Sequence, residues 1–159
     1  FSKIDGLNFL KKKNKKFDLI LIKQTIHLFN KKQIRPLLNN AKSRLKIGGK
    51  LLIFSLKTKN NQIPCFKQMK QKLDKSLKED EILFKIIKIK LVNSKMSNFN
   101  FKVNITKKKY IKMIKNRYIS CLLNMPSRNL RAGINEFRSK YKTNVRFTDS
   151  LKYIFFKKN

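Results

Sequence analysis

Acidic residues, histidine and cysteine are scarce in this sequence, and tryptophan is absent. The 159 residues include only 8 Asp and Glu, 1 His and 2 Cys. Cys65 and Cys121 belong to no CxxC motif and have no histidine beside them, so we expect neither a metal site nor a disulfide. Reduced thiols favour an intracellular compartment, for which we expect an organelle such as the mitochondrion, with the cytoplasm as the alternative.

Long hydrophobic runs are missing as well. No stretch of 18 or more apolar residues occurs, so the sequence predicts no transmembrane helix, and we expect no membrane partner. A chain of 159 residues with 41% hydrophobic content and 13 Phe can bury a moderate core. We therefore expect one domain that covers residues 1–159.

What the sequence has in excess is positive charge. Lys and Arg number 41, and the formal net charge is +33. After Glu81 the only acids are Glu136 and Asp149. A polyanion such as RNA is the partner that this imbalance favours, because each cation near a phosphate releases condensed counterions. The alternative is an AT-rich coding sequence, which raises the Lys content but does not by itself remove acids.

Basic clusters indicate where phosphates would be contacted. The candidate nucleic-acid residues are Lys11, Lys12, Lys13, Lys15, Lys16, Lys107, Lys108, Lys109, Arg117, Arg128, Arg131 and Arg138. Tyr110 and Tyr118 stand among the second cluster and are candidates for stacking on bases. The alternative is that these side chains only face solvent. No sequence-specific RNA motif is present.

The first half of the chain has the pattern of a strand, a helix and a second strand. The apolar run 17–22 predicts a central strand buried on both faces. Apolar residues at spacings of three and four predict a helix over 31–47, which ends at Gly48-Gly49, and residues 50–56 predict the next buried strand. Together they predict a right-handed βαβ unit.

The second half is predicted to be mainly helical. Residues 65–77 predict a helix, and 78–92 mix both periodicities, for which we favour a helix over a strand. Alternation over 99–105 predicts a half-exposed strand, after which Thr106 caps a helix, and Ser127 caps another that runs through Lys140. Residues 144–147 and 151–156 predict an edge hairpin.

Two motifs carry a family resemblance. FDLILIKQTIHLF at 17–29 and LLNNAKSRLKIGGKLLIFSL at 37–56 resemble the fourth-strand and fifth-strand motifs of class I S-adenosylmethionine (SAM)-dependent methyltransferases, of the type 11-like kind. The segments 109–123, 130–141 and 146–158 are similar to the tail of small-molecule members. The resemblance implies an α/β fold with a Rossmann-like methyltransferase sheet, incomplete at its N-terminus. It also implies a helical insertion at 106–142 before the last strand pair.

The same resemblance implies cofactor-binding residues. Asp5 would face the adenine amino group and the backbone amide of Gly6 would face the ring. Lys23 and Gln24 would line the carboxyl edge of the strand at 17–22, which is where ligands bind in doubly wound folds. His27 lies at the same edge, as a base or as a packing residue, and we assign no catalytic residue.

The glycine-rich turn that holds the SAM methionyl group has no counterpart in this sequence. Its glycines are Gly6, Gly48, Gly49 and Gly133, and none forms a GxG. The acidic residue that holds the ribose is also missing. We therefore expect a chain that is inactive alone, retained as a basic RNA-associated part of a ribonucleoprotein such as an organellar ribosome. The alternatives are a fragment whose SAM-binding half lies upstream or on a partner chain, and an unrelated basic α/β RNA-binding domain.

Overall fold

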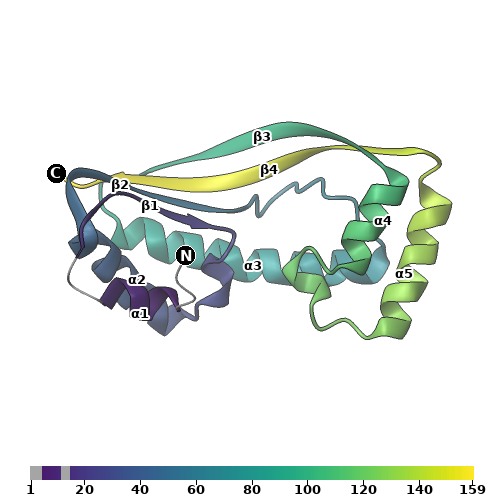
Figure 1. The fold of residues 1–159 in the computed structure, drawn as a ribbon, viewed down its shortest axis with the longest axis horizontal. Coiled ribbons are helices and arrows are strands. Elements are labelled where there is room, and N and C mark those ends of the chain that lie inside the picture. Colours follow the sequence, from purple (N-terminus) through teal and green to yellow (C-terminus); the bar gives the residue numbers. More distant parts are fainter. Residues whose placement is uncertain (1–4, 12–14) are drawn as a thin grey trace. The chain divides into compact units, whose positions relative to one another are not determined.

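The computed structural model describes residues 5–11 and 15–159 (Figure 1). The elements in chain order are α1 (Gly6–Lys11), β1 (Phe17–Lys23), a 3-10 turn (Ile26–Leu28), α2 (Lys31–Arg44), β2 (Leu45–Leu56), α3 (Lys67–Lys90), β3 (Lys95–Thr106), α4 (Lys107–Lys115), a 3-10 turn (Ser120–Leu122), α5 (Ser127–Lys140) and β4 (Asn144–Lys157). The mixed α/β class that the sequence predicts is confirmed.

The chain forms two compact units. Unit 1 comprises Phe1–Thr58, Glu79–Phe99 and Leu151–Asn159, and unit 2 comprises Lys59–Lys78 and Asn100–Ser150. The long elements α3, β3 and β4 contribute residues to both units. The helical segment expected at 106–142 corresponds to α4, the second 3-10 turn and α5, all of which belong to unit 2.

A four-stranded sheet with the order β1-β2-β4-β3 provides the frame. β1 pairs in parallel with β2, with Leu21 opposite Leu52, and β2 pairs antiparallel with β4, with Ile53 opposite Ile154. Because α2 connects the parallel pair, the predicted βαβ unit is confirmed. The last strand of the chain therefore lies inside the sheet, next to β2.

The core of unit 1 lies on one face of this sheet. Leu51 and Ile53 of β2 pack in one buried cluster with Leu37 of α2 and with Phe84 and Ile87 of α3. Figure 1 shows α1, α2 and α3 on the same side of the strands. On the opposite face the cross-strand neighbours Phe54 and Tyr153 are only half-buried, with ring centroids 5.4 Å apart. One face of the sheet thus remains partly open to solvent.

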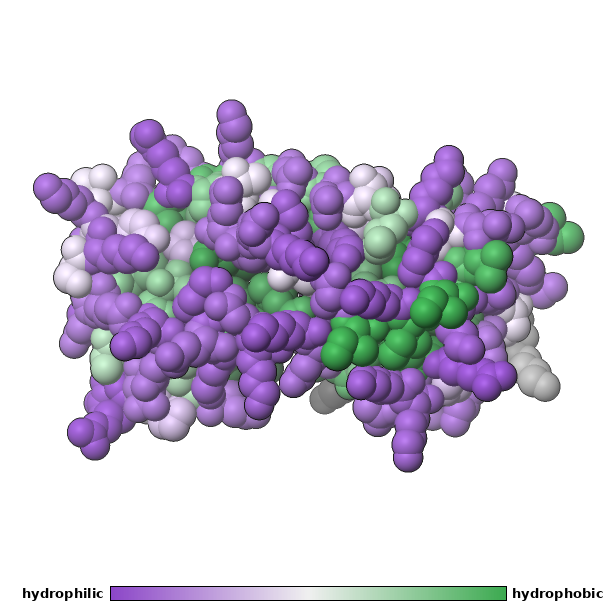
Figure 2. Space-filling model, turned by 180° about the vertical axis from the view of Figure 1, so that it is seen from behind, coloured by the Kyte–Doolittle hydropathy of each residue, from purple (hydrophilic) through white to green (hydrophobic). Residues whose placement is uncertain are grey.

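Hydrophilic side chains dominate the surface. Figure 2 shows one face of the molecule, on which they surround a continuous hydrophobic band. Exposed apolar side chains among the described residues include Ile89 on α3, at 72% exposure, and Val92 after it, at 70%. The helices in the described part of the chain include none that is both long and apolar enough to cross a membrane.

The prediction that residues 17–22 form a central strand is wrong. β1 is the first strand of the sheet and pairs only with β2 among the described strands. Leu19 and Leu21 are 51% and 53% exposed. A continuous apolar run indicates burial on both faces only when neighbours cover both of them, and this information lies outside the run itself.

The prediction that Gly48-Gly49 ends the helix is also wrong. α2 ends at Arg44, and β2 begins at Leu45 and includes both glycines. Gly48 has a φ of 75° and donates to the Lys158 carbonyl, while Gly49 accepts from the Lys158 amide. A Cβ on Gly49 would lie 3.0 Å from the Phe17 carbonyl oxygen, so glycine permits a close approach within the sheet.

Other boundaries differ as well. Residues 65–77 and 78–92 form one helix, α3, instead of two separate helices. The prediction of a helix rather than a strand for 78–92 is confirmed. The segments 144–147 and 151–156 are not an edge hairpin, because β4 is a single strand between β2 and β3. Thr106 caps α4 as predicted, whereas Ser127 lies inside α5, whose N-cap is Pro126 without a side-chain bond.

Unit 2 has a tight contact between α5 and Phe66, the residue just before α3. An ideal Cβ on Gly133 would lie 2.3 Å from two ring atoms of Phe66, whose side chain is 1% exposed. Overpacking of a buried site costs about 1–3 kcal/mol. The absence of a side chain at residue 133 therefore lets α5 approach the start of α3.

We expect Gly133→Ala to lower the free energy of unfolding by about 1 kcal/mol or more, because this overpacking outweighs the better helix propensity of Ala. The measurement is urea unfolding followed by circular dichroism. The matched control is Gly6→Ala, where the new Cβ would lie at an ordinary 3.7 Å from Phe29. Equal stability of the two variants would contradict the tight contact.

Candidate nucleic-acid interface

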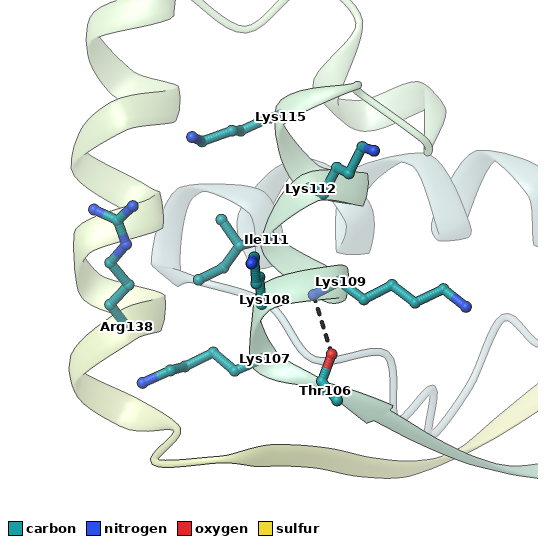
Figure 3. A pocket seen from close by; sticks show the side chains of 8 residues that line it. All are labelled: Thr106, Lys107, Lys108, Lys109, Ile111, Lys112, Lys115 and Arg138. Carbon is teal, nitrogen blue, oxygen red and sulfur yellow. Dashed lines mark hydrogen bonds between the residues drawn. The ribbon is translucent and has the colours of Figure 1, made fainter.

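A concentration of positive charge lies in unit 2, in a cleft of about 740 Å³ along α4 and α5 (Figure 3). We call it the basic cleft. Its lining residues are Thr106, Lys107, Lys108, Lys109, Ile111, Lys112, Lys115 and Arg138. Six of these eight carry a positive charge, and none carries a negative charge. The cleft is therefore suited to anions.

Buried aromatic contacts hold α4 in place. Tyr110 is 1% exposed and stacks on Phe137 of α5 with ring centroids 5.1 Å apart. Its hydroxyl donates to the Pro64 carbonyl at 2.9 Å. Because a hydroxyl has only one hydrogen to donate, the Tyr118 hydroxyl is the donor in its 2.7 Å hydrogen bond with the Tyr110 hydroxyl. Burial raises the pKa of both tyrosines, so both stay neutral. With Tyr110 turned inward, the lysines on either side of it face outward.

The first turn of α4 is fixed at both ends. The Thr106 hydroxyl accepts from the Lys109 amide at 3.3 Å, and the Lys107 amide donates to the Thr143 carbonyl at 2.8 Å. Figure 3 shows the side chains of Lys107 and Lys115 directed toward α5, where Arg138 lies, while Lys109 points the other way. The charges on the two helices thus converge on the same space.

Two of the three acids of unit 2 are bonded away from the cleft. Glu136 accepts from the Lys67 amide at 2.8 Å, at the first residue of α3, and Asp74 pairs with Lys70. Burial raises the pKa of Asp149, which weakens its tendency to carry charge. Among the described residues no carboxylate pairs with a cleft cation. The field in the cleft is therefore uncompensated within the described part of unit 2.

Four of the predicted nucleic-acid residues meet in the basic cleft: Lys107, Lys108, Lys109 and Arg138. The sequence analysis missed Lys112 and Lys115. Their spacing from Lys108, at four and seven residues, places all three on one helical face, and this signal was available in the sequence.

Other predicted cations lie elsewhere. Arg117 donates to the carbonyl oxygens of Leu122 and Leu123, at 3.0 Å for Leu123, and so closes the turn after α4. Lys11, Lys15 and Lys16 are exposed in unit 1, Lys12 and Lys13 lie outside the described residues, and Arg128 and Arg131 are exposed on α5 without lining the cleft. Their role in binding stays a prediction.

The proposed stacking role of Tyr110 is not compatible with its burial, because a ring that is 1% exposed offers no face to a base. Tyr118 is 38% exposed, and its hydroxyl is bonded to Tyr110. The aromatic residues of α4 and of the turn after it therefore mainly contribute to packing.

In unit 1 the residues predicted to bind SAM surround the ends of α1 and β1. Asp5 Oδ1 accepts from the Asn8 amide at 3.0 Å and so caps α1, which begins at Gly6. Lys23 is the exposed last residue of β1, and Gln24, with φ 52°, donates its amide to the Phe54 carbonyl at 2.8 Å. The backbone of Gln24 thus extends the pairing with β2.

A groove of about 310 Å³, which we call the β1 groove, runs beside β1. Its lining includes Gly6, Phe9 and Leu10 of α1, Leu19 and Leu21 of β1, and Thr25. Lys23 and Gln24 do not line it. The lining contains one polar side chain, Thr25, and neither a carboxylate for ribose hydroxyls nor a glycine-rich turn. The β1 groove by itself therefore does not fit SAM.

His27 lies near a buried carboxylate rather than an open site. Asp80 on α3 is 4% exposed and accepts from the Ser55 hydroxyl at 3.1 Å. Burial raises the pKa of Asp80, and the nearby His27 and the Ser55 hydrogen bond oppose this rise. The half-buried position of His27 beside β2 and α3 is that of a packing residue.

The cysteines show no sign of reactivity. Both are free and half-buried, and burial raises the pKa of Cys65 to about 12 and that of Cys121 to about 11. Neutral thiols are poor nucleophiles and poor metal ligands. The described residues contain no cluster of His, Cys, Asp and Glu that could hold a metal ion.

The shifted carboxyl gives a pH-dependent prediction. The pKa of Asp80 is higher in the folded chain than the ~3.9 of an exposed Asp, so folding stability falls as pH rises through the raised pKa. We expect Asp80→Asn to raise the melting temperature relative to the parent chain more at pH 7 than at pH 4. The control is Asp74→Asn on the same helix, which removes an exposed charge paired with Lys70. A pH-independent difference for Asp80→Asn would contradict the raised pKa.

Three solved structures illustrate what the chain is similar to. A SAM-dependent methyltransferase from Archaeoglobus fulgidus has 13% identity and a TM-score of 0.47, over 99% of this chain and 66% of that one. The plantazolicin methyltransferase BamL, bound to a triazolic desmethylPZN analog and SAH, has 14% identity and a TM-score of 0.44, over 98% and 59%. Phosphoethanolamine N-methyltransferase 2 of Haemonchus contortus, bound to S-adenosyl-L-methionine, has 14% identity and a TM-score of 0.40, over 89% of this chain and 33% of that one.

The chain therefore spans less than two thirds of the length of each of these structures. No protein-family model matches it, and no curated protein sequence matches it. Identities of 13–14% with TM-scores of 0.40–0.47 describe a distant likeness and imply no shared activity. Each of these three solved structures is a methyltransferase, and SAM-dependent methyltransferases are the family that the sequence motifs of this chain resemble.

Proposed function

We propose that this chain is a methyltransferase-like protein without methyl-transfer activity of its own, which serves as a basic, RNA-associated structural component of a ribonucleoprotein. An organellar ribosome, such as that of the mitochondrion, is an assembly of this kind. The observation that carries the proposal is the basic cleft, whose lining residues include six cations from α4 and α5 and no carboxylate.

The chemistry of the cleft favours a phosphate backbone. Lysines and an arginine at several positions match a repeating array of phosphates better than a single small anion. A cleft lined by one sign of charge also concentrates a polyanion at its mouth. The lining has neither histidine nor carboxylate for acid–base catalysis. Binding, rather than turnover, is the function that these residues support, and it would not depend on RNA sequence.

A second candidate function rests on a different observation. The outer edge of β1 carries no strand among the described residues, and the β1 groove lacks polar groups for SAM. A fragment of an active SAM-dependent methyltransferase would have these features if its cofactor-binding half were supplied upstream or by another chain. In that case SAM would be the cofactor of the complete enzyme only.

We expect the chain to bind structured RNA with an affinity that falls steeply with salt, measured by filter binding from 50 to 300 mM KCl. The triple variant Lys108→Gln, Lys112→Gln, Arg138→Gln should reduce the slope of log K against log salt by about 2–3, because each phosphate contact contributes ~0.9.

The matched control for that experiment is Lys72→Gln, Lys75→Gln, Lys78→Gln, which removes three exposed charges from α3 within unit 2. Its slope should remain close to that of the parent chain. An equal loss in both triple variants would show that RNA responds to net charge alone, and would refute the cleft as the binding site.

The two candidate functions differ in an isothermal titration of the chain with SAM. We expect no heat of binding at micromolar concentrations, because the β1 groove offers a single polar side chain. Saturable micromolar binding would contradict the lack of a donor site and favour the enzyme. No SAM binding together with no RNA binding would favour the fragment over the ribonucleoprotein component.

A further inference from the structure

Each of the two helices of the basic cleft carries a row of cations. On α4, Lys108, Lys112 and Lys115 stand four and three residues apart, which places them along one helical face. On α5, Arg131 and Arg138 are seven residues apart and also share one face, and Arg138 lines the cleft. We call these the α4 row and the α5 row. Each is about 10 Å long, because a helix rises ~1.5 Å per residue.

The two rows lie on antiparallel neighbouring helices. The Lys107 amide donates to the Thr143 carbonyl at 2.8 Å, so the start of α4 meets the chain just after the end of α5. Figure 3 shows Arg138 beside the first turn of α4, with Lys115 at the far end of that helix. Arg131, two turns before Arg138, therefore extends the α5 row toward the Lys115 end. Because the axes of packed helices are typically ~8–10 Å apart, the rows border a narrow space.

The charges in these rows are held in place before any ligand binds. Asn135 lies between the two arginines of the α5 row, and its Oδ1 accepts from Arg138 Nη1 at 3.3 Å. The Thr106 cap and the buried ring of Tyr110 fix α4. A flexible single strand loses conformational freedom when it is fixed to such an array, whereas a duplex already holds its phosphates in position. Preorganised cations thus favour a preorganised polyanion.

The basic cleft offers no platform for unpaired bases. None of the described residues that line it is aromatic. Its only uncharged polar residue, Thr106, has its hydroxyl bonded to the Lys109 amide. Single-stranded RNA is usually held by bases that stack on aromatic side chains and are read at their edges. The lining therefore supports contacts to phosphates and disfavours a single strand.

Double-helical RNA presents phosphates in an arrangement that fits two rows. Its A-form major groove is deep and narrow, so the phosphates of the two strands approach each other across it. The major groove of B-DNA is wider, at ~12 Å, and keeps its two phosphate rows further apart. A single strand has only one row of phosphates. Two cation rows across a narrow space therefore match the RNA duplex best.

We propose that the basic cleft binds double-helical RNA across its major groove, with the α4 row on the phosphates of one strand and the α5 row on those of the other. This inference rests on the proposed RNA-associated function and names the form of RNA that the site takes. It also assigns a phosphate contact to Arg131, which is exposed but does not itself line the cleft.

The first test compares three probes with the same number of phosphates in filter binding to the full chain. They are an RNA hairpin with a fully paired stem, oligouridine, and a DNA duplex of the stem sequence. We expect the RNA hairpin to bind about tenfold or more tightly than either of the others. Equal binding of oligouridine would overturn the duplex inference and leave RNA association intact. Equal binding of the DNA duplex would overturn the fit to a narrow groove. No binding of either RNA would refute the proposed function itself.

The second test concerns the α5 row. Arg131→Gln with Arg138→Gln should reduce the slope of log K against log salt for the RNA hairpin by about 2, because each phosphate contact contributes ~0.9. The matched control is Arg128→Gln with Lys140→Gln, which removes two exposed cations from the same helix outside the row and should leave the slope unchanged. Circular dichroism verifies that both variants are folded. An equal change in both would contradict the assigned contacts.

An RNA duplex in which one strand carries neutral methylphosphonates separates the two rows. Only one row can then meet charged phosphates, and α4, with five of the six cleft cations, is expected to occupy the charged strand. The Arg131→Gln, Arg138→Gln variant should therefore bind this duplex like the parent chain. If the variant loses as much slope here as with the unmodified hairpin, the two rows do not contact different strands.

Discussion

The pairing of β2 with β1 on one side and with β4 on the other holds unit 1 together. It joins residues 17–23, 45–56 and the end of the chain in one sheet. The core of α2 and α3 forms on the face that this pairing creates, with Leu51, Ile53 and Ile154 fully buried. Among the described strands, β1 pairs only with β2. The stability of unit 1 therefore depends on the position of β2.

In unit 2 the corresponding constraint is the burial of Tyr110. Its ring stacks on Phe137 and its hydroxyl is satisfied by Pro64 and Tyr118. A helix with one face buried in this way must direct the remaining side chains outward. Because nearly all of these side chains are lysine in α4, packing of the core produces a charged surface. The basic cleft is thus a consequence of how α4 is anchored.

The features connected with function come from different parts of the chain. The motifs that resemble methyltransferases belong to the strands and turns of unit 1, and these residues mainly build the sheet. Asp5 caps a helix, Gln24 continues a strand, and His27 lies beside buried Asp80. The cations that converge belong to unit 2, outside those strand motifs. A fold resembling that of an enzyme and a surface suited to a polyanion are therefore compatible in one chain.

Local patterns in the sequence indicated the helical regions of α2, α3, α4 and α5, the parallel strand pair and the cap at Thr106, because periodicity and capping depend on residues close along the chain. They also determined that the charge is strongly positive, and they identified Lys107, Lys108, Lys109 and Arg138. Only the tertiary structure decided that β1 lies at an edge of the described sheet, that β4 is one strand next to β2, and that Arg44 is buried over the ring of Phe17. Strand order and the meeting of α4 with α5 arise from contacts between residues far apart in sequence, and no short window of sequence contains them.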